Sequence, residues 1–69
     1  MKVIRIENVF SSNPSISWFS VDVELDDGTI LRDVDVIDNG TSINVNGADP
    51  ALREQIIGAT FEEAKRRQR

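Results

Sequence analysis

The stretch from Trp18 to Val45, WFSVDVELDDGTILRDVDVIDNGTSINV, decides the fold. Aliphatic and polar residues alternate along it in three runs, and this alternation is typical of strands that bury one face. Asp27-Gly28 and Asn39-Gly40 separate the runs, and both dipeptides favour the two-residue turns of β-hairpins. The stretch therefore predicts three antiparallel strands joined by two tight turns.

The two turns also predict how the strands pair. A two-residue loop at Asp27-Gly28 gives these facing pairs: Leu25 with Ile30, Val23 with Arg32, and Val21 with Val34. A two-residue loop at Asn39-Gly40 gives two more: Val36 with Ile43, and Val34 with Val45. Both registers put aliphatic residues on one face of the sheet, and this agreement between independent turns supports the assignment.

The flanking segments complete one small domain. Residues 2–10 alternate well enough for a first strand, with Ile4 and Ile6 expected on one side and Arg5 on the other. Asp49 followed by Pro50 is typical of a helix start, with Asp49 as the N-cap. Apolar residues then recur at helical spacing as far as Ala64, which predicts an amphipathic helix.

The expected fold is α+β. It is a four-stranded antiparallel β-meander packed on one face by a single C-terminal helix, because one layer on another is the smallest arrangement that buries both apolar surfaces. The strands should span about residues 2–10, 16–26, 29–38 and 41–46, and the helix about residues 50–67.

Composition removes most enzymatic chemistries. The 69 residues include no cysteine, histidine or tyrosine, so disulfides, thiolate ligands and the commonest general base are all absent. No glycine-rich phosphate loop is present either. We expect a protein that is not an enzyme and binds no cofactor. Without an apolar run long enough to span a bilayer or serve as a signal peptide, we also expect a cytoplasmic protein with no membrane partner.

Net charge is −4 and is unevenly distributed. Carboxylates dominate the predicted sheet, whereas cations gather at the end of the helix, as Lys65, Arg66, Arg67 and Arg69. An acidic surface repels phosphate backbones, so nucleic-acid binding is disfavoured as the main activity. Cations at a helix C-terminus also have an ordinary structural role, which is to complement the helix dipole.

The polar face of the predicted sheet nominates one candidate surface. Its expected partner-binding residues combine carboxylates with apolar side chains: Trp18, Asp22, Glu24, Leu31, Asp33, Asp35 and Ile37. Asp22 should face Asp33 directly, and like charges in that position destabilise a sheet. Arg32 is the one charge that this register directs toward the helix.

Our leading hypothesis is a non-enzymatic interaction module, an adaptor or inhibitor that binds a basic protein surface through this face. Trp18 would be the main apolar anchor, since aromatic residues are enriched at interface centres. Imitation of the charge pattern of DNA is a sharper form of the hypothesis, and small acidic domains without cysteine are typical of phage accessory proteins.

Several alternatives remain open at this stage. The carboxylates can simply be solvated, with Arg5 on the neighbouring strand relieving Asp22. A divalent cation held by Asp22, Glu24, Asp33 and Asp35 fits the ligand chemistry, but side chains on a pleated surface rarely converge. The basic helix end can serve a nucleic-acid-associated regulator, and the polar face can pack on a second copy in a homodimer. Trp18 belongs to the core instead if a bulge separates it from Phe19.

Overall fold

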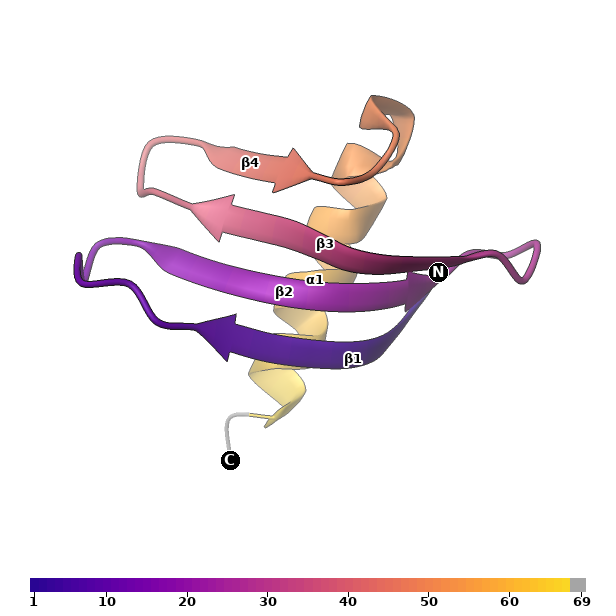
Figure 1. The fold of residues 1–69 in the computed structure, drawn as a ribbon, viewed down its shortest axis with the longest axis horizontal. Coiled ribbons are helices and arrows are strands. Elements are labelled where there is room, and N and C mark those ends of the chain that lie inside the picture. Colours follow the sequence, from indigo (N-terminus) through magenta and orange to yellow (C-terminus); the bar gives the residue numbers. More distant parts are fainter. Residues whose placement is uncertain (68–69) are drawn as a thin grey trace.

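The structure, a computed structural model that describes residues 1–67, confirms the four-stranded meander and its helix (Figure 1). The antiparallel strands follow chain order across the sheet: β1 (Lys2–Val9), β2 (Ser17–Glu24), β3 (Ile30–Asp38) and β4 (Ile43–Asn46). A 3₁₀ turn, η1 (Pro50–Leu52), leads into α1 (Arg53–Arg67). No helix within residues 1–67 is long and apolar enough to cross a membrane.

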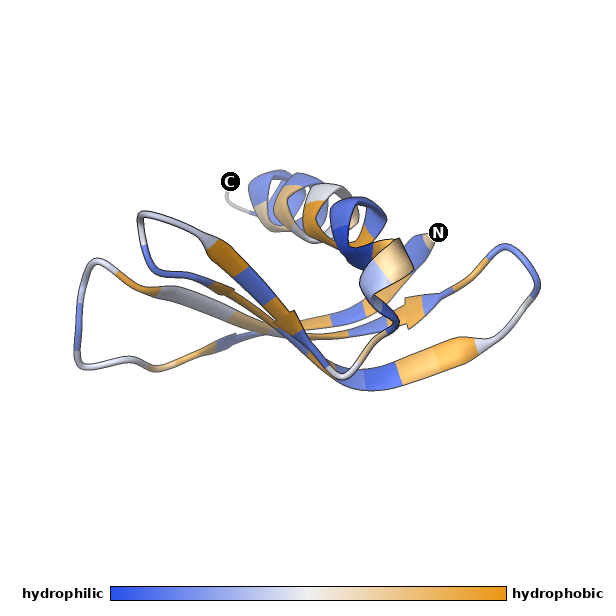
Figure 2. Ribbon diagram, turned by 90° about the horizontal axis from the view of Figure 1, so that it is seen from above, coloured by the Kyte–Doolittle hydropathy of each residue, from blue (hydrophilic) through white to orange (hydrophobic). Residues whose placement is uncertain are grey.

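The molecule has two layers, with α1 on one side of the sheet and nothing on the other (Figure 2). The helix runs across the strands rather than along them, and its last turn passes beyond β1 (Figure 1). Asp49 is an N-cap as predicted, because its carboxylate accepts a hydrogen bond from the Ala51 N–H at 2.9 Å, but it caps η1, and α1 itself begins only at Arg53.

The core lies between the sheet and α1. Five aliphatic side chains are fully buried there: Val21, Val23, Val34, Val36 and Ile56. Phe19 and Phe61 close one end of the core with an edge-to-face contact, their ring centroids 5.7 Å apart. Each buried aliphatic side chain contributes about 1.5–3 kcal/mol, so this small set supplies much of the stability.

The β2–β3 turn is one residue longer than expected. Leu25 N–H donates to the Thr29 carbonyl at 2.8 Å, so a three-residue loop, Asp26 to Gly28, joins the strands. Gly28 has φ +89°, the left-handed conformation that the last position of such a loop requires. Near the turn, Val23 therefore lies opposite Leu31, and the predicted pairing of Val23 with Arg32 is wrong.

A β-bulge then restores the predicted register. β3 has one extra residue at Arg32 and Asp33, and beyond it Val21 lies opposite Val34 as expected. Between the turn and the bulge, the shifted register places two side chains on the faces opposite to those predicted. Leu31 packs toward the core, whereas Arg32 lies on the polar face, so the predicted positions of both side chains are wrong.

The β3–β4 hairpin is also displaced, but its faces are those predicted. The turn is centred on Gly40 and Thr41, because Asn39 N–H donates to the Ser42 carbonyl at 3.1 Å. Val36 consequently lies opposite Val45 rather than Ile43. A displacement of two residues leaves every side chain on its original face.

A second bulge lies in β1. Val3 is opposite Val23 and Arg5 is opposite Asp22, which leaves Ile4 as the extra residue. Val3 and Ile6 both pack toward the core, while Ile4 is 40% exposed. The expectation that Ile4 and Ile6 share a face is therefore wrong.

Candidate partner-binding face

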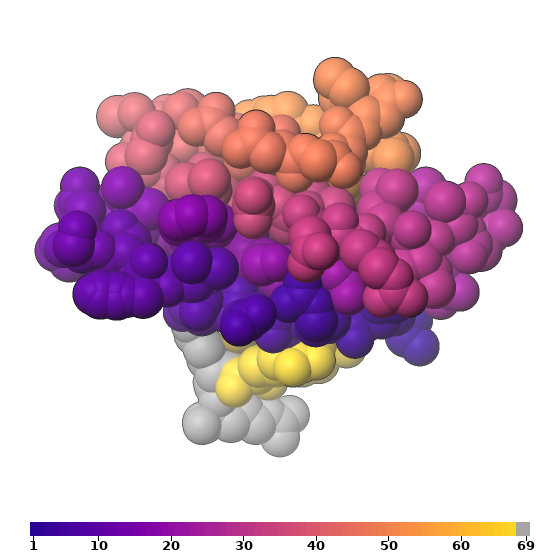
Figure 3. Space-filling view, in the orientation of Figure 1, coloured from indigo at the N-terminus to yellow at the C-terminus, as the bar shows by residue number. Residues whose placement is uncertain are grey.

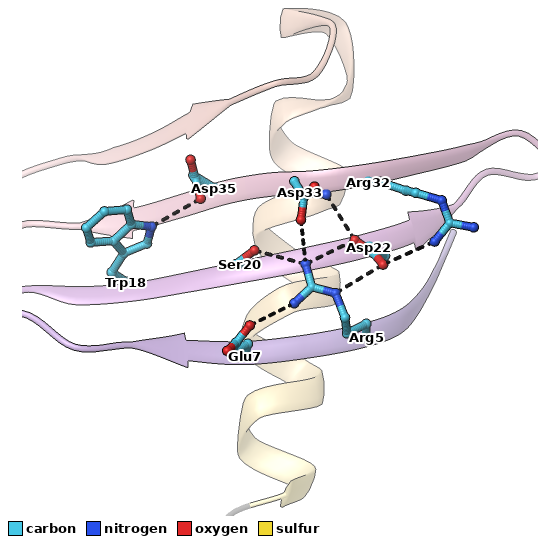
Figure 4. Close-up of polar contacts among 8 residues, drawn as sticks. All are labelled: Arg5, Glu7, Trp18, Ser20, Asp22, Arg32, Asp33 and Asp35. Atoms are coloured by element: carbon cyan, nitrogen blue, oxygen red, sulfur yellow. Dashed lines mark hydrogen bonds and ion pairs between the residues drawn. The ribbon is translucent and has the colours of Figure 1, made fainter.

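The sheet face that points away from α1, which we call the outer face, is open to solvent across all four strands (Figure 3). No element within residues 1–67 covers it. Two parts of this face differ in chemistry. One is an ionic network centred on Arg5 and Asp22, and the other is an apolar row that contains Trp18 (Figure 4).

The two bulges meet at Asp22, on the central strand β2. Its side chain is only 9% exposed. One carboxylate oxygen, Oδ1, accepts the backbone N–H of Asp33 at 2.9 Å and Arg5 Nη2 at 3.1 Å. The other, Oδ2, lies 3.0 Å from Arg5 Nε and 3.5 Å from Arg32 Nη1. The carboxylate thus accepts a hydrogen bond from Nη2 of Arg5, forms an ion pair with Nε of the same guanidinium and also accepts a backbone N–H.

Arg5 links the rest of the network. Its Nη2 donates to Ser20 Oγ at 2.9 Å and to Asp33 Oδ1 at 3.2 Å, while Nη1 donates to Glu7 Oε2 at 3.2 Å. The expectation that Arg5 relieves Asp22 is confirmed.

Electrostatics follows from this geometry. The hydrogen bonds from Arg5, and then that from the Asp33 N–H, lower the pKa of Asp22 below its ordinary value, although partial burial opposes them. Asp33 has φ +55°, and the backbone of this residue, rather than its carboxylate, meets Asp22. The predicted repulsion between the Asp22 and Asp33 carboxylates is therefore replaced by an attractive contact.

Trp18 lies on the outer face and is half-buried. It stands opposite Val9 on one side and Ile37 on the other, so three apolar residues form a row across β1, β2 and β3. Its indole Nε1 donates to Asp35 Oδ1 at 3.2 Å. The register between Trp18 and Phe19 is continuous, so the alternative with a bulge at that point does not occur.

The structure thus divides the predicted surface. Trp18, Asp35 and Ile37 come together at one end, whereas Asp22 and Asp33 belong to the ionic network. Glu24 lies beyond that network, paired across the sheet with Lys2 and Ile30, and Leu31 is on the opposite face.

Sequence reasoning missed two residues at the Trp18 end. Val9 completes the apolar row, and Phe10, just after β1, is 77% exposed. The consecutive apolar residues Val9 and Phe10, which interrupt the alternation, were the available signal.

The geometry gives less support to the two other candidate sites, the metal site and the basic helix end. Within residues 1–67, no three acidic residues gather as a metal site would require. In the helix end, Arg67 pairs with Glu63 at 2.8 Å, and Arg66 lies 3.5 Å from Glu63 and 3.8 Å from Glu62. These pairs reduce the free positive charge, and Arg69 lies outside the described residues.

Both edges of the sheet carry features that oppose pairing with another strand. The bulge at Ile4 interrupts β1, and the helix end passes beyond that edge (Figure 1). At the other edge, β4 is only four residues long, and Arg53 Nη2 donates to the Ile43 carbonyl at 2.6 Å. The outer face is therefore the more accessible surface for association.

A scan against protein-family models finds no match for this chain, and searches of curated proteins and of solved structures find none either.

Proposed function

We propose that this protein is a non-enzymatic interaction module, an adaptor or inhibitor, that binds a basic protein surface through the Trp18 end of the outer face. The observation that carries the proposal is the row of Val9, Trp18 and Ile37 on the uncovered face of the sheet. Aromatic and apolar side chains are the composition expected at the centre of an interface, and the neighbouring carboxylates suit its polar rim.

The position of Trp18 supports its role as the anchor. A hydrogen bond to Asp35 and neighbours on both sides restrict its ring, so little conformational entropy remains to be lost on binding. Tryptophan is also among the residues most enriched at the energetic centre of interfaces.

The charge of the outer face favours a partner of opposite sign. The unneutralised negative charge covers a smaller part of this face than the composition suggested. Arg5 and Arg32 already neutralise much of the charge of Asp22 and Asp33. A DNA mimic needs an extended array of unpaired negative charge, so we favour an interface with an apolar centre and acidic surroundings. Leu31 is excluded from this interface by its position toward the core.

The proposal is tested by partner capture from a lysate of the source organism at near-physiological salt. The immobilised protein is compared with the variants Trp18→Ala and Ile37→Asp. Glu54→Gln is the control, because the Glu54 side chain is exposed and lies on α1, away from the outer face. Far-UV circular dichroism verifies that each variant remains folded. We expect at least one protein whose capture requires Trp18 and Ile37 but tolerates Glu54→Gln.

The contrary result is capture that is indifferent to both outer-face substitutions. Sedimentation of the purified protein separates a further alternative, the homodimer. A dimer that dissociates in Trp18→Ala would identify the partner as a second copy of this chain instead of a different, basic protein.

A further inference from the structure

We propose that the Trp18–Asp35 pair is a recognition site for an arginine side chain, with the guanidinium stacked on the indole and bonded to the Asp35 carboxylate. This inference rests on the proposed function, because it names the chemical group that the partner presents to the same surface.

The carboxylate of Asp35 can still accept hydrogen bonds from a cation, whereas the neighbouring carboxylates already bind arginine. Among the side chains of residues 1–67, it hydrogen-bonds only Trp18, through Oδ1. Asp22, by contrast, is contacted by both Arg5 and Arg32, and Asp33 by Arg5. Asp35 is therefore an outer-face carboxylate without an arginine, one row of the sheet from carboxylates that have one.

The indole offers the second half of the site. Figure 4 shows it lying along the sheet with one ring face turned outward, and its N–H directed at Asp35. A cation above this ring would lie beside the carboxylate as well, so the two attractions act on the same group. The hydrogen bond fixes the relative positions of ring and carboxylate before any ligand arrives.

Arginine fits this arrangement better than lysine. A guanidinium is planar, stacks on aromatic rings and can donate two parallel hydrogen bonds to a carboxylate, whereas an ammonium is a strongly hydrated point charge. Arg5 shows that the outer face accommodates a guanidinium against an aspartate, using Nε and Nη2 toward Asp22. The overall charge of −4 also favours approach of a cationic segment.

The test uses a capped octa-arginine peptide as the probe, with capped octa-lysine and an uncharged Gly-Ser peptide as comparisons. Trp18 is the only tryptophan, so its fluorescence and its single indole N–H resonance report on this site alone. We expect a saturable change with octa-arginine, weaker binding of octa-lysine, and no change with the uncharged peptide at the same salt concentration.

Matched variants distinguish the contribution of the proposed site to peptide binding from that of the net charge. Asp35→Asn and Glu54→Gln each remove one negative charge, but only the first alters the proposed site. Loss of a charged hydrogen-bond partner should weaken binding of octa-arginine about tenfold in Asp35→Asn. Glu54→Gln should bind nearly as well as the parent protein.

Equal weakening in the two variants, a change that does not saturate, or equal affinity for the two cationic peptides would overturn the inference. If octa-arginine leaves the indole unaffected while lysate capture still requires Trp18, this inference fails and the proposed function stands. If octa-arginine binds as expected but no captured protein depends on Trp18 or Ile37, the proposed function fails instead.

Discussion

The backbone N–H of Asp33 donates a hydrogen bond of 2.9 Å to the carboxylate of Asp22, and the two residues therefore attract each other where their charges alone would repel. The bulge in β3 brings the N–H to Asp22, and the hydrogen bond is stronger when the carboxylate is ionised. It connects the fold of the outer face to the protonation of one buried carboxylate.

Acid should therefore destabilise the protein through Asp22. Because its pKa in the folded state is lowered, chiefly by Arg5, the folded protein binds fewer protons than the unfolded chain at pH values between the two pKa values. The stabilisation is complete above the unfolded pKa of about 3.9 and is lost as the pH falls through the folded pKa. Asp27 and Glu63, whose pKa values are also lowered, add to the same trend.

Urea unfolding between pH 7 and pH 2 measures this effect. Asp22→Asn should be less stable than the parent protein at pH 7 and should lose less stability on acidification. Glu54→Gln, at an exposed position, should follow the parent curve. Parallel curves for Asp22→Asn and the parent would show that Asp22 does not titrate as the contacts imply.

The conformation of Asp33 predicts a second stability effect. Its φ of +55° is left-handed, and aspartate tolerates that region better than a β-branched residue does. Asp33→Val should cost about 1–3 kcal/mol in the free energy of unfolding, whereas Asp33→Gly should cost much less. Both variants lose the ion pair with Arg5, so their difference isolates the backbone conformation. Equal losses in thermal unfolding would contradict a role for the bulge geometry.

The alternation of side chains predicted the faces of the strands, but loop lengths and bulges were not readable from it. Asp27-Gly28 suits either a two-residue turn or the end of a three-residue loop, because glycine supplies the positive φ in both. The prediction misplaced Leu31 and Arg32 because it assumed the shorter loop. The bulge at Asp33 returns the rest of β3 to the predicted register.

The candidate site was predictable to a similar extent. Trp18, Asp35 and Ile37 lie beyond the bulge, where alternation alone assigns the outer face correctly. In β1, the adjacent residues Val3 and Ile4 are both apolar, so either could have faced the core, and the sequence did not reveal which one the bulge exposes. The bond between Trp18 and Asp35 depends on side-chain geometry that a pattern does not contain.

Glycine at two positions predicts opposite outcomes on substitution. Gly58 lies within α1, and a Cβ added there would meet nothing within 4 Å. Gly58→Ala should therefore stabilise the protein by about 1 kcal/mol, because alanine loses less conformational entropy in a helix. In a domain of this size, such a change raises Tm by about 4–8 °C.

Gly47→Ala is the natural comparison. Gly47 has φ +94°, a backbone conformation that alanine rarely adopts, so strain should lower Tm even though an added Cβ would make only an ordinary contact, 3.5 Å from the Asp33 carbonyl oxygen. Differential scanning calorimetry distinguishes the two. A lower Tm in Gly58→Ala would contradict the open space around Gly58, because alanine could destabilise the helix there only by meeting a neighbouring group.

Thr60 has a buried hydroxyl that is not satisfied. Its side chain is fully buried on the core side of α1, and Oγ1 finds no hydrogen-bond partner within the described residues. Such a group costs about 1–3 kcal/mol relative to a satisfied one, so Thr60→Val should raise the free energy of unfolding by about 1 kcal/mol. Thr60→Ser retains the hydroxyl and removes a methyl group, and it should lower that energy by about 1 kcal/mol. Chemical denaturation of the two variants tests the argument, and a loss of stability in Thr60→Val would mean that the hydroxyl does bond, most simply to a carbonyl one helical turn earlier.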